Sequence, residues 1–304
     1  MTDNPAIFDR ALIRSRRRRA AALAAAFGPA TFLLDRARDD LVERLAAVLR
    51  RFELAVDLGS PGEAVREALS RLDSVGAIVK IDALPPDGRR ADGLVVVGDE
   101  EALPFADGSL DLVVSALTLQ FANDLPGVLV QIRRALRADG LFLAALAGGD
   151  TLTELRQAFA AAECEVEGGA SPRVAPFADL RELGGLLQRA GFALPVADVD
   201  RVCVRYDSAF ALMRDLRRMG AANALFARRR SPLRRTTLMR MAEIYAERFS
   251  DADGRLRATF DIVWLSGWAP HPDQQRPLRP GTAKARLADA LGTHEISTGE
   301  KAGS

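Results

Sequence analysis

The sequence predicts an α/β fold built around a mainly parallel sheet. In the first half of the 304-residue chain, short apolar runs typical of buried strands alternate with segments of helical periodicity. This alternation favours parallel strands joined by right-handed helical crossovers. A glycine-containing turn at residues 59–62 directly follows the first apolar run, as in folds that bring a helix N-terminus to a nucleotide.

Two helices are expected before the first strand, at residues 6–26 and 32–52. In the second, Leu34, Leu41 and Leu45 recur at helical spacing. Residues 1–52 are therefore predicted to form a helical cover that docks on the sheet or closes its cofactor edge.

Strands and helices then alternate through residues 53–150, the predicted cofactor half. Strands are expected at 54–58, 77–82, 111–115 and 141–146, with a buried third strand beginning at Gly93. Helices are expected at about 62–73 and from Pro126, just inside the helix start, to Leu136.

The second half, residues 151–270, reads as a substrate or insertion half of the same domain, which spans 53–270. Thr151 and Glu154 have the spacing of a capping box at the start of a helix over about 151–163. The remaining elements expected are a flexible stretch at 167–177, a helix ending at 190–191, a strand at 196–206, helices at 208–219 and 233–249, and a last strand at 259–268. Residues 271–304 are expected to be an irregular tail.

Composition narrows the classes of function. The formal net charge is +1, so no global field favours nucleic acid or a membrane, and no apolar run reaches the ~20 residues of a membrane span. Peripheral membrane contact stays open. Cys164 and Cys203 fit a reducing compartment and are expected to be buried structural residues.

Near the N-terminus, Arg14 and Arg16 to Arg19 form a basic run. Asp3 and Asp9 weaken its interpretation as a transit peptide. A solvated helix face is the favoured interpretation, and a patch for an anionic partner is the alternative.

The turn after the first strand indicates a cofactor site but departs from the usual glycine pattern of such turns. Asp57 stands at the strand's end and Gly59 follows it, but proline occupies position 61 and glutamate position 63. Proline lacks an N–H and fixes φ, and Glu63 brings negative charge to the start of the next helix. Gly62 is expected to take over the close approach to a ligand.

Asp82 ends the second predicted strand, 25 positions after Asp57. A carboxylate at this point of a nucleotide-binding fold accepts both ribose hydroxyls, because its two oxygens match a vicinal diol. A cap on the following turn is the alternative.

Several motifs together resemble a class I S-adenosylmethionine-dependent methyltransferase, which implies a Rossmann-like, mainly parallel seven-stranded sheet with an antiparallel last strand. They are the acidic-x-Gly turn, the acid at 82, Asp-x-x-x-Leu-Pro-Phe at 99–105, Asp-Gly-Ser-Leu-Asp-Leu-Val-Val-Ser at 107–115 and a Leu-Arg-Ala-Asp-Gly turn at 136–140. The resemblance implies that S-adenosylmethionine is the cofactor, and Pro61 and Glu63 are the positions where this sequence departs from the family's glycine turn. It assigns Asp57 and Gly59 to the methionine part, Asp82 to the ribose, Asp99 and Glu100 to the adenine amino group, and Ser115 to Leu117 to the methyl-transfer face.

Later segments are similar to the family of mitochondrial complex I assembly factor five and its bacterial relatives. They include residues 116–126, Gly-Gly-Asp-Thr-Leu-Thr-Glu-Leu-Arg at 148–156 and Glu-Gly-Gly-Ala-Ser-Pro at 167–172. This resemblance implies an enzyme that hydroxylates an arginine of an iron–sulfur subunit of complex I, located in the cytoplasm of a bacterium or on the matrix side in a eukaryote. A malonyl-carrier-protein or small-molecule methyltransferase, and a non-catalytic assembly chaperone, stay open as alternatives.

The residues suggest no definite catalytic group. Asp150 and Glu154 are candidates for contact with a substrate guanidinium, which pairs with carboxylates in a bidentate manner, and a helix cap is the favoured alternative. The only histidines are His271 and His294, too few and too far along the chain for a site of two histidines and a carboxylate holding iron. No metal site is therefore expected.

Overall fold

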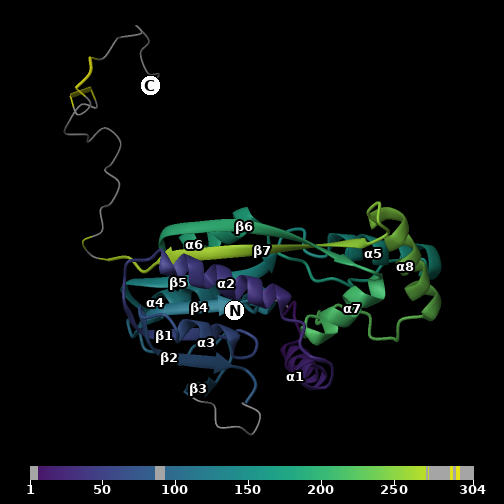
Figure 1. Cartoon of the computed structure of the whole chain (residues 1–304), viewed down its shortest axis with the longest axis horizontal. Helices are drawn as coiled ribbons and strands as arrows, with labels where there is room; N and C mark the ends of the chain where they lie inside the picture. The colour runs from purple at the N-terminus through teal and green to yellow at the C-terminus, as the bar shows by residue number, and fades with distance from the viewer. Residues whose placement is uncertain (1–5, 86–92, 272, 274–287, 290–291, 295–304) are drawn as a thin grey trace. The chain divides into compact units, whose positions relative to one another are not determined.

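The structure is a computed structural model that describes residues 6–85, 93–271, 273, 288–289 and 292–294. The chain forms two compact units, Met1–Pro270 and His271–Ser304. The sheet and helices described below belong to the first unit (Figure 1). In the described part of the chain, no helix is long and apolar enough to cross a membrane.

A seven-stranded sheet of order β3-β2-β1-β4-β5-β7-β6 forms the centre of this unit. Its strands are β1 (Phe52–Leu58), β2 (Val75–Asp82), β3 (Leu94–Val97), β4 (Leu110–Ala116), β5 (Leu136–Gly148), β6 (Ala193–Tyr206) and β7 (Leu256–Trp268). The pairs from β3 to β5 are parallel, whereas β7 is antiparallel to both β5 and β6. The predicted parallel sheet with an antiparallel last strand is confirmed.

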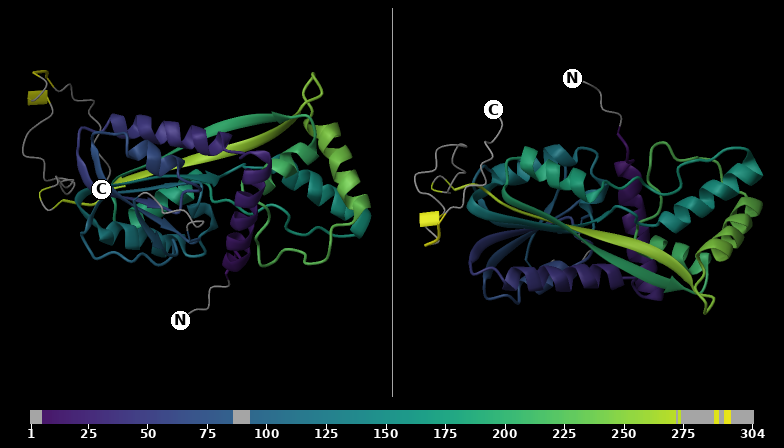
Figure 2. Two further views of the ribbon diagram at one scale, coloured as in Figure 1. Left: turned by 60° about the horizontal axis from the view of Figure 1, so that its bottom comes forward. Right: turned by 90° about the horizontal axis from the view of Figure 1, so that it is seen from above.

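Helices cover both faces of the sheet because successive strand residues point to opposite sides. Leu141 and Leu143 of β5 pack into one core, and Phe142 and Ala144 into another. The helices are α1 (Arg10–Phe27), α2 (Phe32–Ala46), α3 (Ala64–Leu69), α4 (Leu125–Ala135), α5 (Thr153–Glu167), α6 (Leu180–Arg189), α7 (Ala209–Arg218) and α8 (Arg235–Phe249), with a short 3₁₀ turn η1 (Leu119–Phe121). The first core contains α2, α3, α5, α7 and α8, and the second contains α4 and α6. Figure 2 shows α2, in purple, on one side of the sheet, and α4 and α6 pack on the other side.

The long strands β6 and β7 extend beyond the parallel part of the sheet and carry an inserted pair of helices. Both α7 and α8 lie between these strands in sequence, and α8 packs along α5. The N-terminal helix α1 lies beside α7 rather than on the sheet (Figure 1). The predicted helical cover and C-terminal insertions are thus brought together at the carboxyl ends of the parallel strands.

Several local expectations are wrong. The third strand, β3, is an edge strand, with Leu94 and Val97 each 58% exposed, since only β2 pairs with it. Both cysteines are exposed and free instead of buried. Helix α2 ends at Ala46 and α3 has only six residues, both shorter than predicted.

The docking of α2 on the sheet predicts where truncation destabilises the fold. Leu41 is fully buried, whereas Leu49 just beyond α2 is fully exposed. We expect Leu41→Ala to lower the free energy of unfolding by about 2–5 kcal/mol. Leu49→Ala, the control, should change it by less than about 0.5 kcal/mol. Urea unfolding followed by circular dichroism measures both, and equal effects would contradict the packing described here.

Candidate functional site

The candidate site lies at the carboxyl ends of β1 and β4, where the strand order reverses. From β1 the chain runs outward to β2 and β3 and then returns to β4 on the other side. The crevice at such a reversal is the usual ligand position in an open α/β sheet. Asp57, fully buried, sits on β1 with Lys80 and Val114 as its neighbours in register. The sequence placed Asp57 here, and its contact with a cofactor stays a prediction.

The turn after β1 accommodates Pro61 by placing its left-handed residues elsewhere. Positive φ angles occur at Gly59 (+72°) and Gly62 (+65°), where glycine is favoured, and not at Pro61. A Cβ atom at Gly59 would lie 2.6 Å from Oε1 of Glu100, so this position also requires glycine for space. At Gly62 no described atom lies within 4 Å of such a Cβ, which leaves its α-carbon open to a ligand.

A buried lysine holds this turn, and sequence reasoning missed it. Lys80 Nζ donates hydrogen bonds to the carbonyl oxygens of Ser60, at 3.1 Å, and Gly62. The same ammonium lies 3.6 Å from Asp57 Oδ2 and 3.7 Å from Glu63 Oε1. The available signal was a lysine inside an apolar strand, two residues before Asp82.

Glu63 is neutralised by cations rather than left as a free charge at the helix start. Its Oε2 accepts a hydrogen bond of 2.6 Å from Arg66 Nε, and Lys80 approaches its other oxygen. The negative charge at position 63 is thus already compensated within the chain.

Burial dominates the electrostatics of Asp57. Desolvation raises the pKa of its carboxyl group to about 6, although Lys80 and Ser60 favour the charged form. Neither of its oxygens makes a well-formed hydrogen bond within the described chain. A buried carboxylate with unsatisfied oxygens at a cofactor crevice is a suitable acceptor for a ligand ammonium.

Arginines from α1 hold the acidic residues that follow β3. Arg10 Nη2 lies 2.7 Å from Asp99 Oδ1 and pairs with Glu100, which is buried. Arg17 lies 3.2 Å from Glu100 Oε1 and donates a 2.5 Å hydrogen bond to the Gly59 carbonyl. The solvated-face interpretation of the basic run is therefore wrong for Arg17, whose side chain is 15% exposed.

Asp82 lies at the end of β2, close to the same arginine. Its Oδ1 accepts a 3.0 Å hydrogen bond from the Leu84 N–H and lies 3.9 Å from Arg17 Nη1. Asp82 therefore does cap the following turn, and its predicted contact with a ribose stays a prediction.

Little room remains between α1 and Glu100. The cavity there, bordered also by Arg10, Arg17 and Thr118, has a volume of about 30 Å³. That is enough for a water molecule and far too small for an adenine ring. With α1 in this position, its arginines occupy the place predicted for the nucleoside.

The residues after β4 shape the floor of the crevice. Ser115 is buried and donates to the Leu58 carbonyl at 2.7 Å, so its hydroxyl ties β4 to β1. Leu117 has a φ of +52°, uncommon for a bulky residue and typical of functional turns. Thr118, which sequence reasoning missed, donates a 2.6 Å hydrogen bond to the Gly59 carbonyl. The methyl-transfer role of Ser115 and Leu117 stays a prediction.

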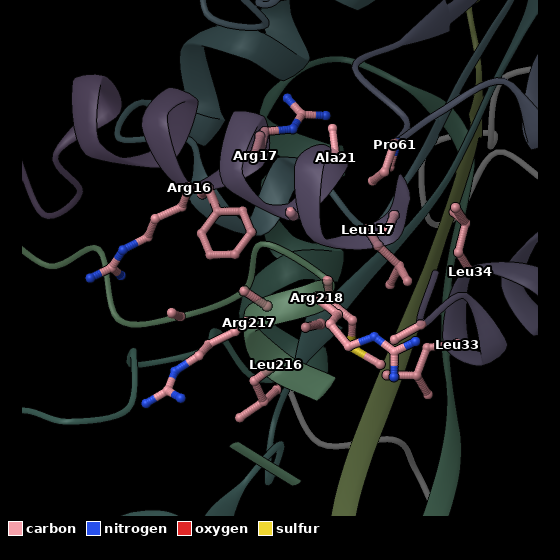
Figure 3. A pocket seen from close by; sticks show the side chains of 18 of the residues that line it. Arg16, Arg17, Ala21, Leu33, Leu34, Pro61, Leu117, Leu216, Arg217 and Arg218 are labelled. Carbon is pink, nitrogen blue, oxygen red and sulfur yellow. The ribbon is translucent and has the colours of Figure 1, made fainter. Parts of the chain in front are cut away.

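A large cavity of about 1040 Å³ opens next to this crevice (Figure 3). Pro61, Lys80 and Leu117 border it on the cofactor side. Apolar side chains from α1, α2, α5 and α7 form most of the rest of its wall, among them Leu33, Leu34, Leu155, Phe159, Met213 and Leu216. The inserted helices and the helical cover therefore enclose a chamber that the sheet alone would lack.

The candidate catalytic acids Asp150 and Glu154 have structural partners and do not line this cavity. Asp150 pairs with Arg201 at 2.6 Å on the surface. Glu154 accepts hydrogen bonds from the Thr259 N–H and hydroxyl. The predicted capping box is absent at the described start of α5, because the Thr151 hydroxyl donates to the Gly148 carbonyl instead. Substrate contact by either acid stays a prediction.

Among the described residues, no group of three or more His, Cys, Asp or Glu side chains is placed to hold a metal ion.

Comparison with known proteins agrees with this geometry. A profile of the methyltransferase domain matches residues 56–144, which run from β1 into β5. Arginine-hydroxylase NDUFAF5 of Danio rerio is 36% identical over 288 residues, covering 93% of this chain and 89% of the relative. The chain belongs to the NDUFAF5 family.

The chain is also similar to proteins outside the NDUFAF5 family. Malonyl-[acyl-carrier protein] O-methyltransferase of Laribacter hongkongensis is 44% identical over 187 residues, covering 62% of this chain and 60% of that protein. The crystal structure of YcgJ protein from Bacillus subtilis matches 78% of this chain and 99% of its own with a TM-score of 0.53 and 13% identity, which shows the shared fold alone. The chain is thus a member of the S-adenosylmethionine-dependent methyltransferase superfamily, which supports that cofactor.

The raised pKa of Asp57 predicts a pH-dependent stability. Between about pH 4 and pH 6 the folded carboxyl keeps a proton that the unfolded one has lost, so rising pH destabilises the fold. Over the whole of this pH range, the shift lowers the free energy of unfolding by about 3 kcal/mol. We expect the ¹³C shift of the Asp57 side chain to titrate near pH 6. The pH dependence of unfolding should be flatter in Asp57→Asn, and identical profiles would contradict the raised pKa.

The position of Arg17 predicts a gain of cofactor affinity when it is removed. Arg17→Gln removes one of the two arginine partners of Glu100, which keeps Arg10, and one of the two hydrogen bonds to the Gly59 carbonyl, which keeps Thr118. S-adenosylmethionine then competes with fewer contacts at this end of the crevice. We expect roughly tenfold tighter binding in calorimetric titration. Arg19→Gln, on the same helix but exposed, is the control and should leave affinity unchanged. Weaker binding in Arg17→Gln would show that this arginine serves the cofactor instead.

Proposed function

We propose that this chain is an S-adenosylmethionine-binding enzyme that modifies an arginine in an iron–sulfur subunit of complex I, by hydroxylation. The observation that carries the proposal is the match to arginine-hydroxylase NDUFAF5, which spans 93% of this chain and therefore includes the helical cover and the inserted helices. These are the parts that form the large cavity beside the crevice.

The chain's own acids fit the cofactor once α1 withdraws its arginines. Asp57 would accept the ammonium of the methionine part, Asp82 the ribose hydroxyls, and Asp99 with Glu100 would face the adenine amino group. Bound S-adenosylmethionine would supply a sulfonium-activated methyl group only for the methyl-transfer alternative. Hydroxylation is a two-electron oxidation of the substrate and needs a separate oxygen-donating oxidant from the cell. The turn at Gly59 and Gly62 gives the backbone space to approach the ligand.

A substrate guanidinium requires acidic partners, and two of the described residues lining the cavity are acidic. These are Glu63 and Asp82, both next to the cofactor turn. An arginine side chain of a protein substrate would therefore reach the crevice through the cavity and meet these carboxylates.

Two observations favour other functions. Arg16 and Arg217 line the cavity and have no acidic partner within ion-pair distance among the described residues, which suits the carboxylate of a malonyl-carrier protein or another anionic methyl acceptor. The occupation of the cofactor acids by Arg10, Arg17 and Lys80 suits a non-catalytic assembly chaperone. The experiments below separate these candidates.

Deletion of the gene tests the principal proposal in the cell, where the oxidant for hydroxylation is present. We expect mass spectrometry of the complex I iron–sulfur subunit to lose one hydroxylated arginine in the deletion strain. The wild-type gene should restore this modification, and Asp82→Asn should restore less than about a tenth of it because a ribose contact is lost. Asp107→Asn, on the exposed surface, is the matched control.

An unchanged set of modified arginines in the deletion strain would overturn the proposal. Restoration of complex I assembly by Asp82→Asn without hydroxylation would favour the chaperone. Growth of the deletion strain only with added biotin would favour the carrier-protein methyltransferase.

A further inference from the structure

We propose that the apolar chamber next to the cofactor crevice binds a single-chain fatty carboxylate, with its tail inside and its head at Arg16 and Arg217. The site goes beyond the proposed function, because it needs neither the cofactor nor an arginine substrate. Three features of the chamber carry the inference: its volume, its apolar wall and its unpaired cations.

The chamber is large, and its lining runs from the cofactor side, at Pro61, Lys80 and Asp82, to the inserted helices. Its volume of about 1040 Å³ lies at the upper end of the range for small-molecule sites, roughly 300–1,000 Å³. Its wall includes Leu155 and Phe159 of α5, Met213 and Leu216 of α7, and Leu33 of α2. Such a wall gives no polar partner to a guanidinium and favours a hydrocarbon chain.

Arg16 is a cation with no ion-pair partner among the residues that the structure describes. Its Nη1 atom is buried from solvent and has no hydrogen-bond acceptor among the described residues. Burial, and then the nearby Arg228, lower the pKa of the Arg16 guanidinium, while Asp9 compensates only in part. An anion placed here would satisfy the buried N–H group and offset the repulsion from Arg228.

A second cation stands on the opposite helix. Arg217 of α7 also lines the chamber, and in the described chain it has no acidic partner within ion-pair distance. Figure 3 shows Arg16 and Arg217 extending to the same side of the cavity from their two helices. The neighbouring Arg218 differs, because it donates to the Phe27 and Gly28 carbonyls and pairs with Asp215.

The two acids that line the chamber already have cations beside them, unlike Arg16 and Arg217, which have no acidic partner in the described chain. Glu63 and Asp82 lie at the cofactor turn, where Lys80 and Arg17 are already their neighbours. A ligand that fits both the apolar wall and the free guanidinium groups therefore carries an anionic head and an apolar tail. A carboxylate matches the planar fork of arginine in a bidentate manner.

Calorimetric titration of the full chain with matched twelve-carbon ligands tests the inference without S-adenosylmethionine. We expect dodecanoate to bind at least tenfold more tightly than 1-dodecanol, and dodecylammonium not to bind. From octanoate to dodecanoate, each added methylene should raise affinity roughly threefold to fourfold, because it buries hydrocarbon. Dodecanol binding as tightly as dodecanoate, or no saturable binding of dodecanoate below its micelle concentration, would overturn the proposal.

Variants separate the head and tail contacts. Arg16→Gln and Arg217→Gln should each weaken the binding of dodecanoate about tenfold and leave the affinity for dodecanol unchanged. Arg19→Gln should change neither affinity. Ala24→Phe, which adds a ring to the α1 wall, should abolish the gain with chain length. Thermal unfolding checks that each variant is folded, and the two arginine variants serve as independent tests of the head site. An equal loss of affinity for dodecanoate and for dodecanol in both arginine variants would contradict an anion site.

If dodecanoate does not bind, the proposed arginine modification can still be correct. If the arginine is not modified, dodecanoate can still bind. The two proposals are therefore distinguishable. Tight binding of dodecyl phosphate with weak binding of dodecanoate would also overturn the carboxylate assignment, in favour of a phosphate head.

Discussion

The neutralisation of buried carboxylates at the ends of the parallel strands is the constraint on which the site depends. Asp57 and Glu100 are almost fully buried, and an isolated buried charge is strongly destabilising. Lys80 compensates Asp57 from the neighbouring strand, and Arg10 and Arg17 compensate Glu100 from α1. The N-terminal helix is thus held over the crevice by charge, beside its contact with α7. A cofactor with a cationic methionine part would satisfy the acid that Lys80 now holds.

The altered glycine turn is explained by the same interactions. A proline at position 61 is tolerated because the left-handed residues are Gly59 and Gly62, and because the Ser60 and Gly62 carbonyls are fixed by Lys80. Glu63 adds a second carboxylate around the same ammonium. The turn is therefore a self-consistent structure rather than a damaged one, and its departure from the usual glycine pattern does not by itself indicate a lost site.

The fold could be predicted from sequence because its signals are local. Apolar runs such as 54–58 and 141–146 and the strand–helix order identify the sheet, and the motifs identify the antiparallel last strand. Lys80 and Arg17 could not be found in this way, since their partners are brought near by tertiary folding. Arg17 lies 83 residues from Glu100 and looks in sequence like part of a solvated basic run. The prediction that both cysteines are buried is wrong for a related reason, because burial depends on how each helix and strand is oriented in the fold.

Helix α1 borders both the acidic crevice and the apolar chamber, and this position joins the two sites physically. Arg16 and Arg17 are consecutive, so they leave the helix about 100° apart. Both border the chamber, and Arg17 also reaches Glu100. A shift of α1 that withdraws Arg17 from Glu100 also moves Arg16. A ligand at either arginine would therefore bias the same helix, and by linkage any effect of one ligand on the affinity of the other must be reciprocal. If both sites take the ligands proposed above, the arginine-rich helix is the element through which the contents of the chamber and of the cofactor crevice would affect each other.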